Sequence, residues 1–295
     1  MSYRPERKLG LSGVDTFGLS KEEFNDLFRE TLNEGMHGIC FSIYEDGQSP
    51  GDIITEAQVR RRMEILHPYV KWVRSFSCID GNEHIPRIAH EFGIRTLVGA
   101  WLGDDPELNE QEIEGLIDLA HKGYVDLAAV GNEVMYRGDL TEEELLGFIH
   151  RVKEALPGIP VGYVDAYYEF SHRPAITDAC DVIFANCYPY WEGCHIDYSL
   201  VYMKQMYQQA VKAANGKKVI ISETGWPSQG GCLRAALASS ENFIRYFVNA
   251  QKWSREDQIG MFYFASFDES WKVGAEGDVG AYWGIWDREE KLKFG

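Results

Sequence analysis

Two glutamates, Glu133 and Glu223, each follow a strongly apolar segment, with amide and aromatic residues close by. Flat aromatic faces stack on the C–H faces of sugar rings, while carboxylates and amides bond the hydroxyl groups. Paired carboxylates in an aromatic groove are what glycoside hydrolysis needs, because one acid protonates the leaving oxygen while the other attacks the anomeric carbon or activates water. A single glutamate after a strand is more often a surface residue or the partner of a helix N-terminus. The prediction therefore depends on there being two.

The elements that must position this pair alternate along the whole chain. Amphipathic helical patterns separate short apolar runs, and parallel strands buried on both faces have this continuous apolar character. Eight runs are predicted as strands: Gly38–Tyr44, Val70–Phe76, Arg95–Trp101, Asp126–Val134, Pro160–Ala166, Asp181–Tyr188, Lys218–Thr224 and Ile259–Phe267. This α/β order predicts a single (β/α)8 TIM barrel, whose active site lies at the carboxyl ends of the strands.

The alternative fold is a doubly wound open sheet. That fold usually carries a glycine-rich phosphate turn after its first strand, and the segment 44–51 contains no GxGxxG pattern. Before the first strand, Ser20 and Glu23 form a capping-box pattern that predicts an additional helix. We therefore expect two parts: residues 1–36 as an N-terminal extension and helix packed on the barrel, and residues 37–295 as the catalytic barrel.

Composition narrows the classes of partner. The 295 residues carry a formal net charge of −17, which argues against nucleic acid and anionic membranes, because phosphates bind positive surfaces. No apolar stretch is long enough to span a membrane. The N-terminal residues are charged and no apolar segment follows them, so we expect a cytoplasmic protein, or a secreted one if a signal peptide has been removed. The oligomeric state stays open.

We expect no cofactor and no metal. The six cysteines lack the spacing of a zinc site. A metal-dependent barrel lyase or isomerase would need clustered histidine and carboxylate ligands at the strand ends. Of the eight histidines, His195 alone falls near the expected mouth of the barrel. This class of enzyme is therefore a distant alternative.

Several motifs at the strand ends resemble glycoside hydrolase family 17, which contains β-1,3-glucanases and β-1,3-glucanosyltransferases. The most specific is SETGWPS at 222–228, whereas Asn132-Glu133 alone is a weak signal. Segments after the sixth and eighth strands agree with the family: ANCYPY at 185–190, FASFDESWK at 264–272, Glu276, and YWGIW at 282–286. The resemblance covers most of the chain from 38 to about 286.

The resemblance implies a retaining mechanism, with Glu133 as general acid/base and Glu223 as nucleophile. It implies that Asn132 holds the sugar 2-hydroxyl, that Tyr188 bonds the nucleophile and that Trp226 is a sugar platform. It further implies that three charged residues form a supporting cluster: Glu269, Lys272 and Glu276. The strand-end positions add three candidate binding residues: Tyr44, Asn186 and Tyr190.

One departure concerns the second strand, where Arg74-Ser75-Phe76-Ser77 replaces the aromatic-Asp ending of the plant enzymes. The first-strand loop, 42–48, is closer to the fungal and bacterial branch. These differences leave the two glutamates in place and bear on the subsites. A glucanosyltransferase with the same site is the main alternative, since it differs only in whether water or a sugar hydroxyl resolves the glycosyl-enzyme. A sugar-binding pseudoenzyme finds no support, because both carboxylates are present.

Three expectations follow for the site. Retention predicts carboxyl groups roughly 5–5.5 Å apart, whereas inversion needs ~6.5–9.5 Å. Repulsion from an ionised Glu223 is expected to raise the pKa of Glu133, so that Glu133 keeps its proton near neutral pH. The loops 131–141 and 225–232 are short to moderate in length, and together with the expected location they favour soluble β-1,3-linked gluco-oligosaccharides as substrates.

Overall fold

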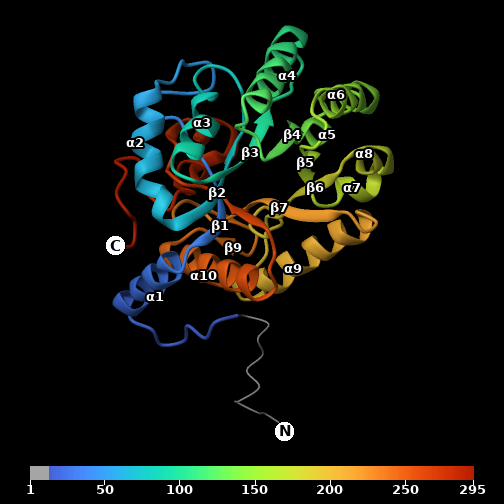
Figure 1. Cartoon of the computed structure of the whole chain (residues 1–295). Coiled ribbons are helices and arrows are strands. Elements are labelled where there is room, and N and C mark those ends of the chain that lie inside the picture. The colour runs from blue at the N-terminus through green and yellow to red at the C-terminus, as the bar shows by residue number, and fades with distance from the viewer. Residues whose placement is uncertain (1–12) are drawn as a thin grey trace.

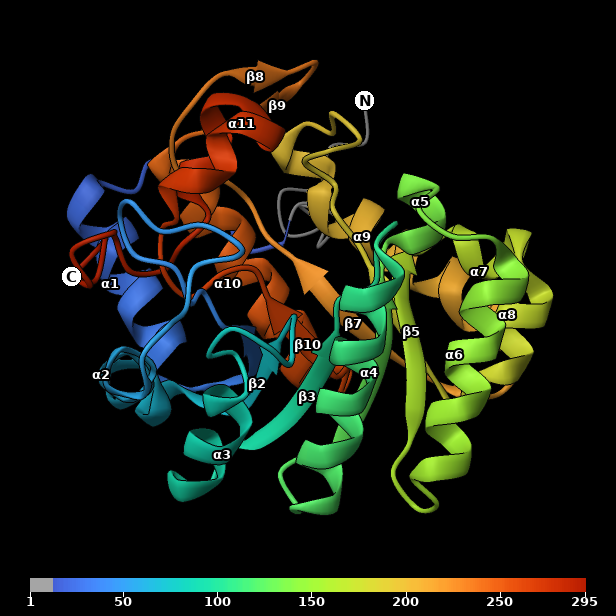
Figure 2. The same ribbon diagram turned by 90° about the horizontal axis from the view of Figure 1, so that it is seen from above.

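Eight parallel strands close into a barrel in the computed structural model, which describes residues 13–295. Neighbours around the barrel follow the order β1-β10-β7-β6-β5-β4-β3-β2, and Figures 1 and 2 show the helices outside them. The barrel strands are β1 (Met36–Cys40), β2 (Val70–Ser75), β3 (Arg95–Ala100), β4 (Leu127–Asn132), β5 (Val161–Ala166), β6 (Val182–Asn186), β7 (Lys218–Thr224) and β10 (Met261–Tyr263). The predicted TIM barrel is confirmed.

The helices start where the sequence provides N-terminal caps. Ser20 and Thr141 each form a complete capping box, with Glu23 and Glu144 respectively, so the box predicted at Ser20 is confirmed. The helices are α1 (Lys21–Asn33), α2 (Glu56–Leu66), α3 (His84–Glu91), α4 (Pro106–His121), α5 (Val134–Arg137), α6 (Glu142–Ala155), α7 (Glu169–His172), α8 (Pro174–Ala179), α9 (Ile196–Ala213), α10 (Ser240–Glu256) and α11 (Val273–Glu276). Short 3-10 turns η2 (His67–Tyr69), η3 (Ser270–Lys272) and η4 (Gly277–Tyr282) complete the set.

The first strand is shorter than predicted. The Phe41 N–H still donates to the Arg74 carbonyl of β2 at 2.9 Å, but beyond Phe41 side chains replace the backbone hydrogen bonds. The Ser42 N–H donates to Ser266 Oγ at 2.8 Å, and the Tyr44 N–H donates to Glu269 Oε1 at 3.0 Å. The strand therefore becomes a loop that carries Tyr44 over the barrel mouth. The sequence pattern also did not predict the small antiparallel hairpin of β8 (Cys232–Leu233) and β9 (Ala236–Leu237).

Helix α1 packs on the outside of the barrel against α10 (Figure 1). The ring of Phe28, fully buried, lies 5.0 Å from that of Phe247 and 5.2 Å from that of Phe294. Burial of such a large apolar side chain stabilises the contact by roughly 1.5–3 kcal/mol. Residues 1–12 of the predicted extension lie outside the described residues. Within residues 13–295, no helix has the length and apolar character needed to cross a membrane.

Candidate active site

The side chains of Glu133 and Glu223 meet at the mouth of the barrel, joined by one amide. Asn186 Nδ2, at the end of β6, lies 2.8 Å from Glu133 Oε1 and 3.3 Å from Glu223 Oε1. The two Oε1 atoms are therefore no more than about 6 Å apart, which is compatible with the roughly 5–5.5 Å between carboxyl groups that retention predicts. The Ser222 hydroxyl donates to Asn186 Oδ1 at 2.8 Å and so fixes the orientation of the bridging amide.

Glu223 is held by a buried arginine and a tyrosine. Arg74 Nη1, from β2 on the far side of the barrel, lies 2.6 Å from Glu223 Oε1. The Tyr188 hydroxyl donates to Glu223 Oε2 at 2.8 Å, which is the contact that the motif predicted. Burial, and then the charge of Glu223, raises the pKa of the Tyr188 phenol well above its ordinary value, so Tyr188 stays a donor.

Glu133 lies in a different electrostatic environment, although it is only a few ångströms away. Burial, followed by repulsion from Glu223, raises the pKa of the Glu133 carboxyl from 4.5 to about 7. The predicted direction is therefore present, but burial is the larger cause. Arg74 Nη2 donates to Asn132 Oδ1 at 2.6 Å, and not to the Glu133 carboxyl. This contact occupies the oxygen of Asn132 and leaves its NH2 group as a donor.

A groove crosses the barrel mouth on both sides of the two glutamates, which line both of its halves. The β1–β3 half has a volume of about 710 Å³ and the β5–β6 half about 800 Å³. Aromatic residues that line the β1–β3 half are Phe41, Tyr44, Phe76, Trp101, Phe264 and Trp271. Aromatic residues that line the β5–β6 half are Tyr136, Tyr167, Tyr168, Tyr188, Trp191 and Phe264. A groove with aromatic walls on both sides of a carboxyl pair suits a sugar chain that extends in both directions.

Comparisons with known proteins agree with this geometry. Residues 38–284 match the model of the BtgE/BtgC glycoside hydrolase domain. A glycoside hydrolase family 17 β-1,3-glucanosyltransferase from Rhizomucor miehei is 31% identical, with a TM-score of 0.79 over 88% of this chain and 96% of that one. The chain belongs to glycoside hydrolase family 17. A glucan 1,3-beta-glucosidase of Candida albicans is 27% identical, covering 79% of this chain and 83% of that protein.

An active-site mutant of the Rhizomucor miehei glucanosyltransferase, solved in complex with laminaritriose, is 30% identical to this family 17 chain and has a TM-score of 0.79. More distant structures share the fold alone. One is a Bacteroides uniformis β-glucuronidase with 16% identity and a TM-score of 0.66. The likeness to the family 17 structures therefore extends to the sequence, whereas the likeness to the glucuronidase is one of architecture.

Two of the predicted substrate-binding residues of this family 17 chain are buried. Trp226 has 0% of its surface exposed and Tyr190 has 1%, and their rings pack together 5.2 Å apart. Trp226 Nε1 donates to the Leu237 carbonyl of β9 at 2.9 Å, while the Tyr190 hydroxyl donates to the Gly231 carbonyl at 3.3 Å. The prediction of Trp226 as a sugar platform and of Tyr190 as a binding residue is therefore wrong. Both rings support the β8–β9 hairpin instead.

The predicted charged cluster lies beside the nucleophile position. Lys272 Nζ lies 2.7 Å from Glu269 Oε2, and Glu276 lines both halves of the groove. Burial raises the pKa of Glu276 to about 7, although the charge of Lys272 opposes this shift. Glu269 also accepts the Tyr44 N–H, so the cluster is joined to the first-strand loop.

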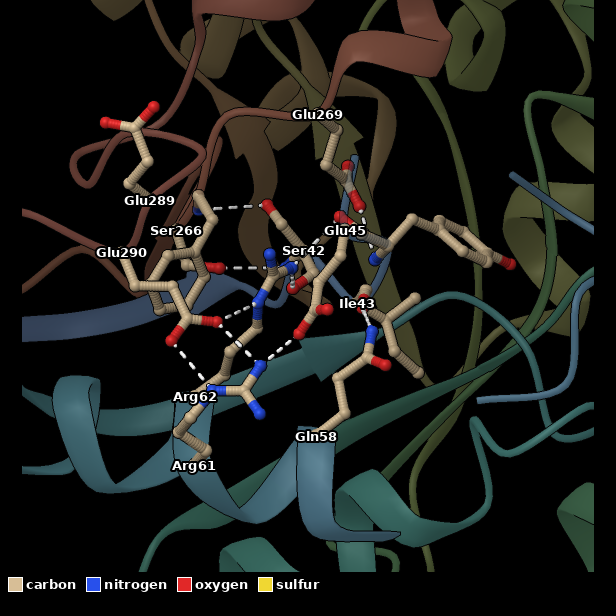
Figure 3. Close-up of polar contacts among 12 residues, drawn as sticks. Ser42, Ile43, Glu45, Gln58, Arg61, Arg62, Ser266, Glu269, Glu289 and Glu290 are labelled. Carbon is tan, nitrogen blue, oxygen red and sulfur yellow. Dashed lines mark hydrogen bonds and ion pairs between the residues drawn. The ribbon is translucent and has the colours of Figure 1, made fainter. Parts of the chain in front are cut away.

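The loop that carries Tyr44 is supported from below by a buried arginine of α2 (Figure 3). Arg62 Nη1 donates to the carbonyls of Ser42 at 2.8 Å and of Tyr44 at 3.1 Å. Its Nε lies 3.1 Å from Glu290 Oε1, so the C-terminal segment is fixed to the same arginine. Tyr44 is thus positioned by the backbone contacts of its loop. Neither Arg62 nor Glu290, which hold this loop, was a predicted site residue.

Sequence reasoning also missed residues that line the groove. Trp191 is 40% exposed and follows β6, and Trp101 is 41% exposed and follows β3. Arg137 lies over the Trp101 ring, 4.5 Å from its centroid, and donates to the Leu102 carbonyl at 2.8 Å. Both tryptophans stand just beyond a strand end, and that position was the signal that could have found them. His195, expected near the mouth, instead caps α9 by accepting the Asp197 N–H at 3.3 Å.

Proposed function

We propose that the chain is a retaining glycoside hydrolase that acts on β-1,3-linked glucan or gluco-oligosaccharides by double displacement. The observation that carries the proposal is the Asn186 bridge, which holds two carboxyl groups of unlike electrostatic surroundings close together. Glu223 has an arginine and a phenol as partners, while burial keeps a proton on Glu133 near neutral pH. Two groups tuned apart in this way suit an acid and a nucleophile.

In the first step, a Glu223 oxygen attacks the anomeric carbon as the bond to the leaving oxygen breaks, and the Glu133 proton moves to that oxygen. The product is a glycosyl ester on Glu223. In the second step, Glu133, now a carboxylate, takes a proton from water as the water oxygen attacks the same carbon. The ester bond breaks, and both glutamates return to their starting states. The Asn132 amide is placed in this scheme at the 2-hydroxyl of the sugar.

The choice of β-1,3-glucan rests on the relatives. Their names include glucan 1,3-beta-glucosidases from Candida albicans and Schizosaccharomyces pombe, which are 27% and 28% identical to this chain. The Rhizomucor miehei relative is described in complex with laminaritriose. The aromatic walls of the groove are consistent with the stacking of glucose rings. These similarities support the linkage, and a product profile on β-1,3-, mixed-linked and β-1,6-linked oligosaccharides tests it.

The stereochemistry of the first product is the sharper test. Proton NMR of laminari-oligosaccharide cleavage should record the β-anomer before mutarotation, because two displacements at one carbon restore its configuration. Initial release of the α-anomer would overturn the double-displacement proposal. No cleavage of any β-glucan or gluco-oligosaccharide by the folded protein would overturn the proposed function itself.

Glucanosyl transfer is a second candidate, favoured by the six aromatic residues of the β5–β6 half and by the 31% identity to a glucanosyltransferase. A sugar held on those rings would attack the ester in place of water. At high oligosaccharide concentration, a transferase should form products longer than its substrate. A hydrolase should form mainly shorter ones under the same conditions.

A further inference from the structure

The short helix α5 begins directly after Glu133, and its first turn lacks the usual cap. An N-cap side chain normally accepts the N–H of the second or third helical residue. Glu133 occupies the N-cap position of α5 but makes no such bond. Its carboxyl group instead faces Asn186 across the barrel mouth. Because the Glu133 side chain contacts Asn186, the first N–H groups of α5 need other hydrogen-bond acceptors.

The neighbouring strand β5 supplies those partners. The Tyr163 hydroxyl oxygen accepts the Met135 N–H at 2.9 Å, and Asp165 Oδ2 accepts the Tyr136 N–H at 3.4 Å. The Tyr163 O–H in turn donates to Asp165 Oδ2. Asp165 has 0% of its surface exposed and Tyr163 has 1%, so water does not compete for these bonds.

The backbone of Glu133 needs this support. Its φ of 51° and ψ of 29° lie in the left-handed region, which costs free energy for a residue with a side chain. Such a conformation persists where the surroundings hold it in several places. The Glu133 N–H donates to the Val164 carbonyl at 2.8 Å, so three successive residues of β5 bind the segment from Glu133 to Tyr136.

We propose that Tyr163 and Asp165 are positioning residues for the general acid, a role that rests on the proposed function of Glu133. They cap α5 from outside and thereby free the Glu133 carboxyl to face the glycosidic oxygen. Neither residue touches substrate in this scheme. A shift of the turn would move the Glu133 proton away from the leaving oxygen while Glu223, on β7, stays in place.

A positioning role predicts a loss of kcat/KM that depends on the leaving group, whereas a general loss of structure would lower kcat/KM equally for all leaving groups. Protonation matters for a leaving group of high pKa and hardly at all for one of low pKa. Aryl β-laminaribiosides with phenols of graded pKa vary this need at constant sugar, and kcat/KM reports formation of the glycosyl-enzyme. Tyr163→Phe keeps the ring and removes the oxygen that accepts the Met135 N–H. We expect it to lower kcat/KM about 10–100-fold for phenol and less than about threefold for 2,4-dinitrophenol.

Asp165→Asn is the second variant, which nearly keeps the side-chain shape and leaves an oxygen to accept the tyrosine proton. We expect a leaving-group dependence steeper than that of the wild type and shallower than that of Tyr163→Phe. Tyr207→Phe is the matched control, since this half-buried tyrosine of α9 packs on Trp253 outside the groove. It should leave the leaving-group dependence unchanged.

An equal loss for all leaving groups in both variants, or no loss in either, would overturn the positioning role. If Tyr163→Phe does not fold, as judged by circular dichroism, Asp165→Asn alone decides by the same criterion. The failure of the proposed function is distinguishable: the wild type would then cleave none of the laminaribiosides. A wild type that cleaves them with a normal leaving-group dependence, beside variants with a uniform loss, would reject the inference alone.

Discussion

Replacing Arg74 with methionine should destabilise the fold strongly, because it leaves the Glu223 carboxylate buried without its cation. Arg74 Nη1 lies 2.6 Å from Glu223 Oε1 and 3.0 Å from the Ser222 carbonyl, and Nη2 lies 2.6 Å from Asn132 Oδ1. At a charge separation of about 4 Å and an effective dielectric constant of about 20, the attraction is about 4 kcal/mol. Removal of one partner from a buried pair costs about 3–5 kcal/mol. We expect a loss in that range.

Urea unfolding followed by circular dichroism at pH 7 measures this change, with the slope against denaturant unchanged if the native state stays compact. A double-mutant cycle with Glu223→Gln isolates the charge interaction, because a neutral amide needs no counter-ion. In the background that carries Glu223→Gln, Arg74→Met should cost at least about 2 kcal/mol less than in the wild type. Arg60→Met is the control, since Arg60 pairs with Glu56 and Glu91 in solvent.

The control substitution should change the unfolding free energy far less, because exposed pairs are screened by water. The reasoning is refuted if Arg74→Met costs less than about 1 kcal/mol, or if it costs as much beside Glu223→Gln as it does alone. The first result would mean that the arginine contributes little to stability, and the second that it acts through packing. A loss of kcat/KM on every substrate is expected alongside, since Asn132 and Glu223 both lose a contact.

Three further predictions concern the two glutamates. Glu223→Ala should abolish cleavage of all aryl laminaribiosides, whereas Glu133→Ala should spare 2,4-dinitrophenyl glycosides; the opposite pattern would exchange the assigned roles. Since burial raises the pKa of Glu133 to about 7, kcat/KM for a phenyl glycoside should fall as the pH rises above about 7, and the same limb should be absent with the dinitrophenyl glycoside. The raised pKa also favours folding below pH 4.5, a contribution lost as the pH rises from 4.5 to about 7. The free energy of urea unfolding of Glu133→Gln minus that of the wild type should therefore be up to about 3 kcal/mol larger at pH 8 than at pH 4. The same value of this difference at both pH values would contradict this account.

The fold could be predicted because local signals agreed with the global architecture. Continuous apolar runs mark strands that are buried on both faces, and capping boxes such as Ser20 with Glu23 mark where helices start. Strand ends were the weaker part of the prediction. Beyond Cys40, the bonds to Ser266 and Glu269 come from residues more than 220 positions away. No local pattern reports such partners, so the predicted strand ran on to Tyr44.

The candidate site could likewise be predicted in part. A residue that ends a barrel strand lies near the mouth, which brings Glu133, Glu223 and Asn186 together. The direction of each side chain is not fixed by that position. Trp226 turns under the hairpin of β8 and β9, and the hairpin was itself absent from the predicted elements. Arg74 was interpreted from the sequence as a subsite difference, and its ion pair with Glu223 was missed. Its partner lies on β7, across the barrel and not on an adjacent strand.

The placement of the arginines accounts for the different roles of two glutamates that share one bridging amide. Arg74 spans the barrel with both terminal nitrogens occupied, Nη1 by Glu223 and Nη2 by Asn132. Arg137, on the helix after Glu133, donates to the Asn132 and Leu102 carbonyls and stacks on Trp101. The pKa of Glu133 is therefore raised mainly by burial and by the Glu223 charge, and the opposing attraction of Arg74 is smaller than either. An arginine in contact with Glu133 instead would lower the pKa of that carboxyl and favour its ionised form, so Glu133 could no longer act as the general acid. The division of labour thus depends on which carboxylate the cation contacts, because both are buried at the same mouth.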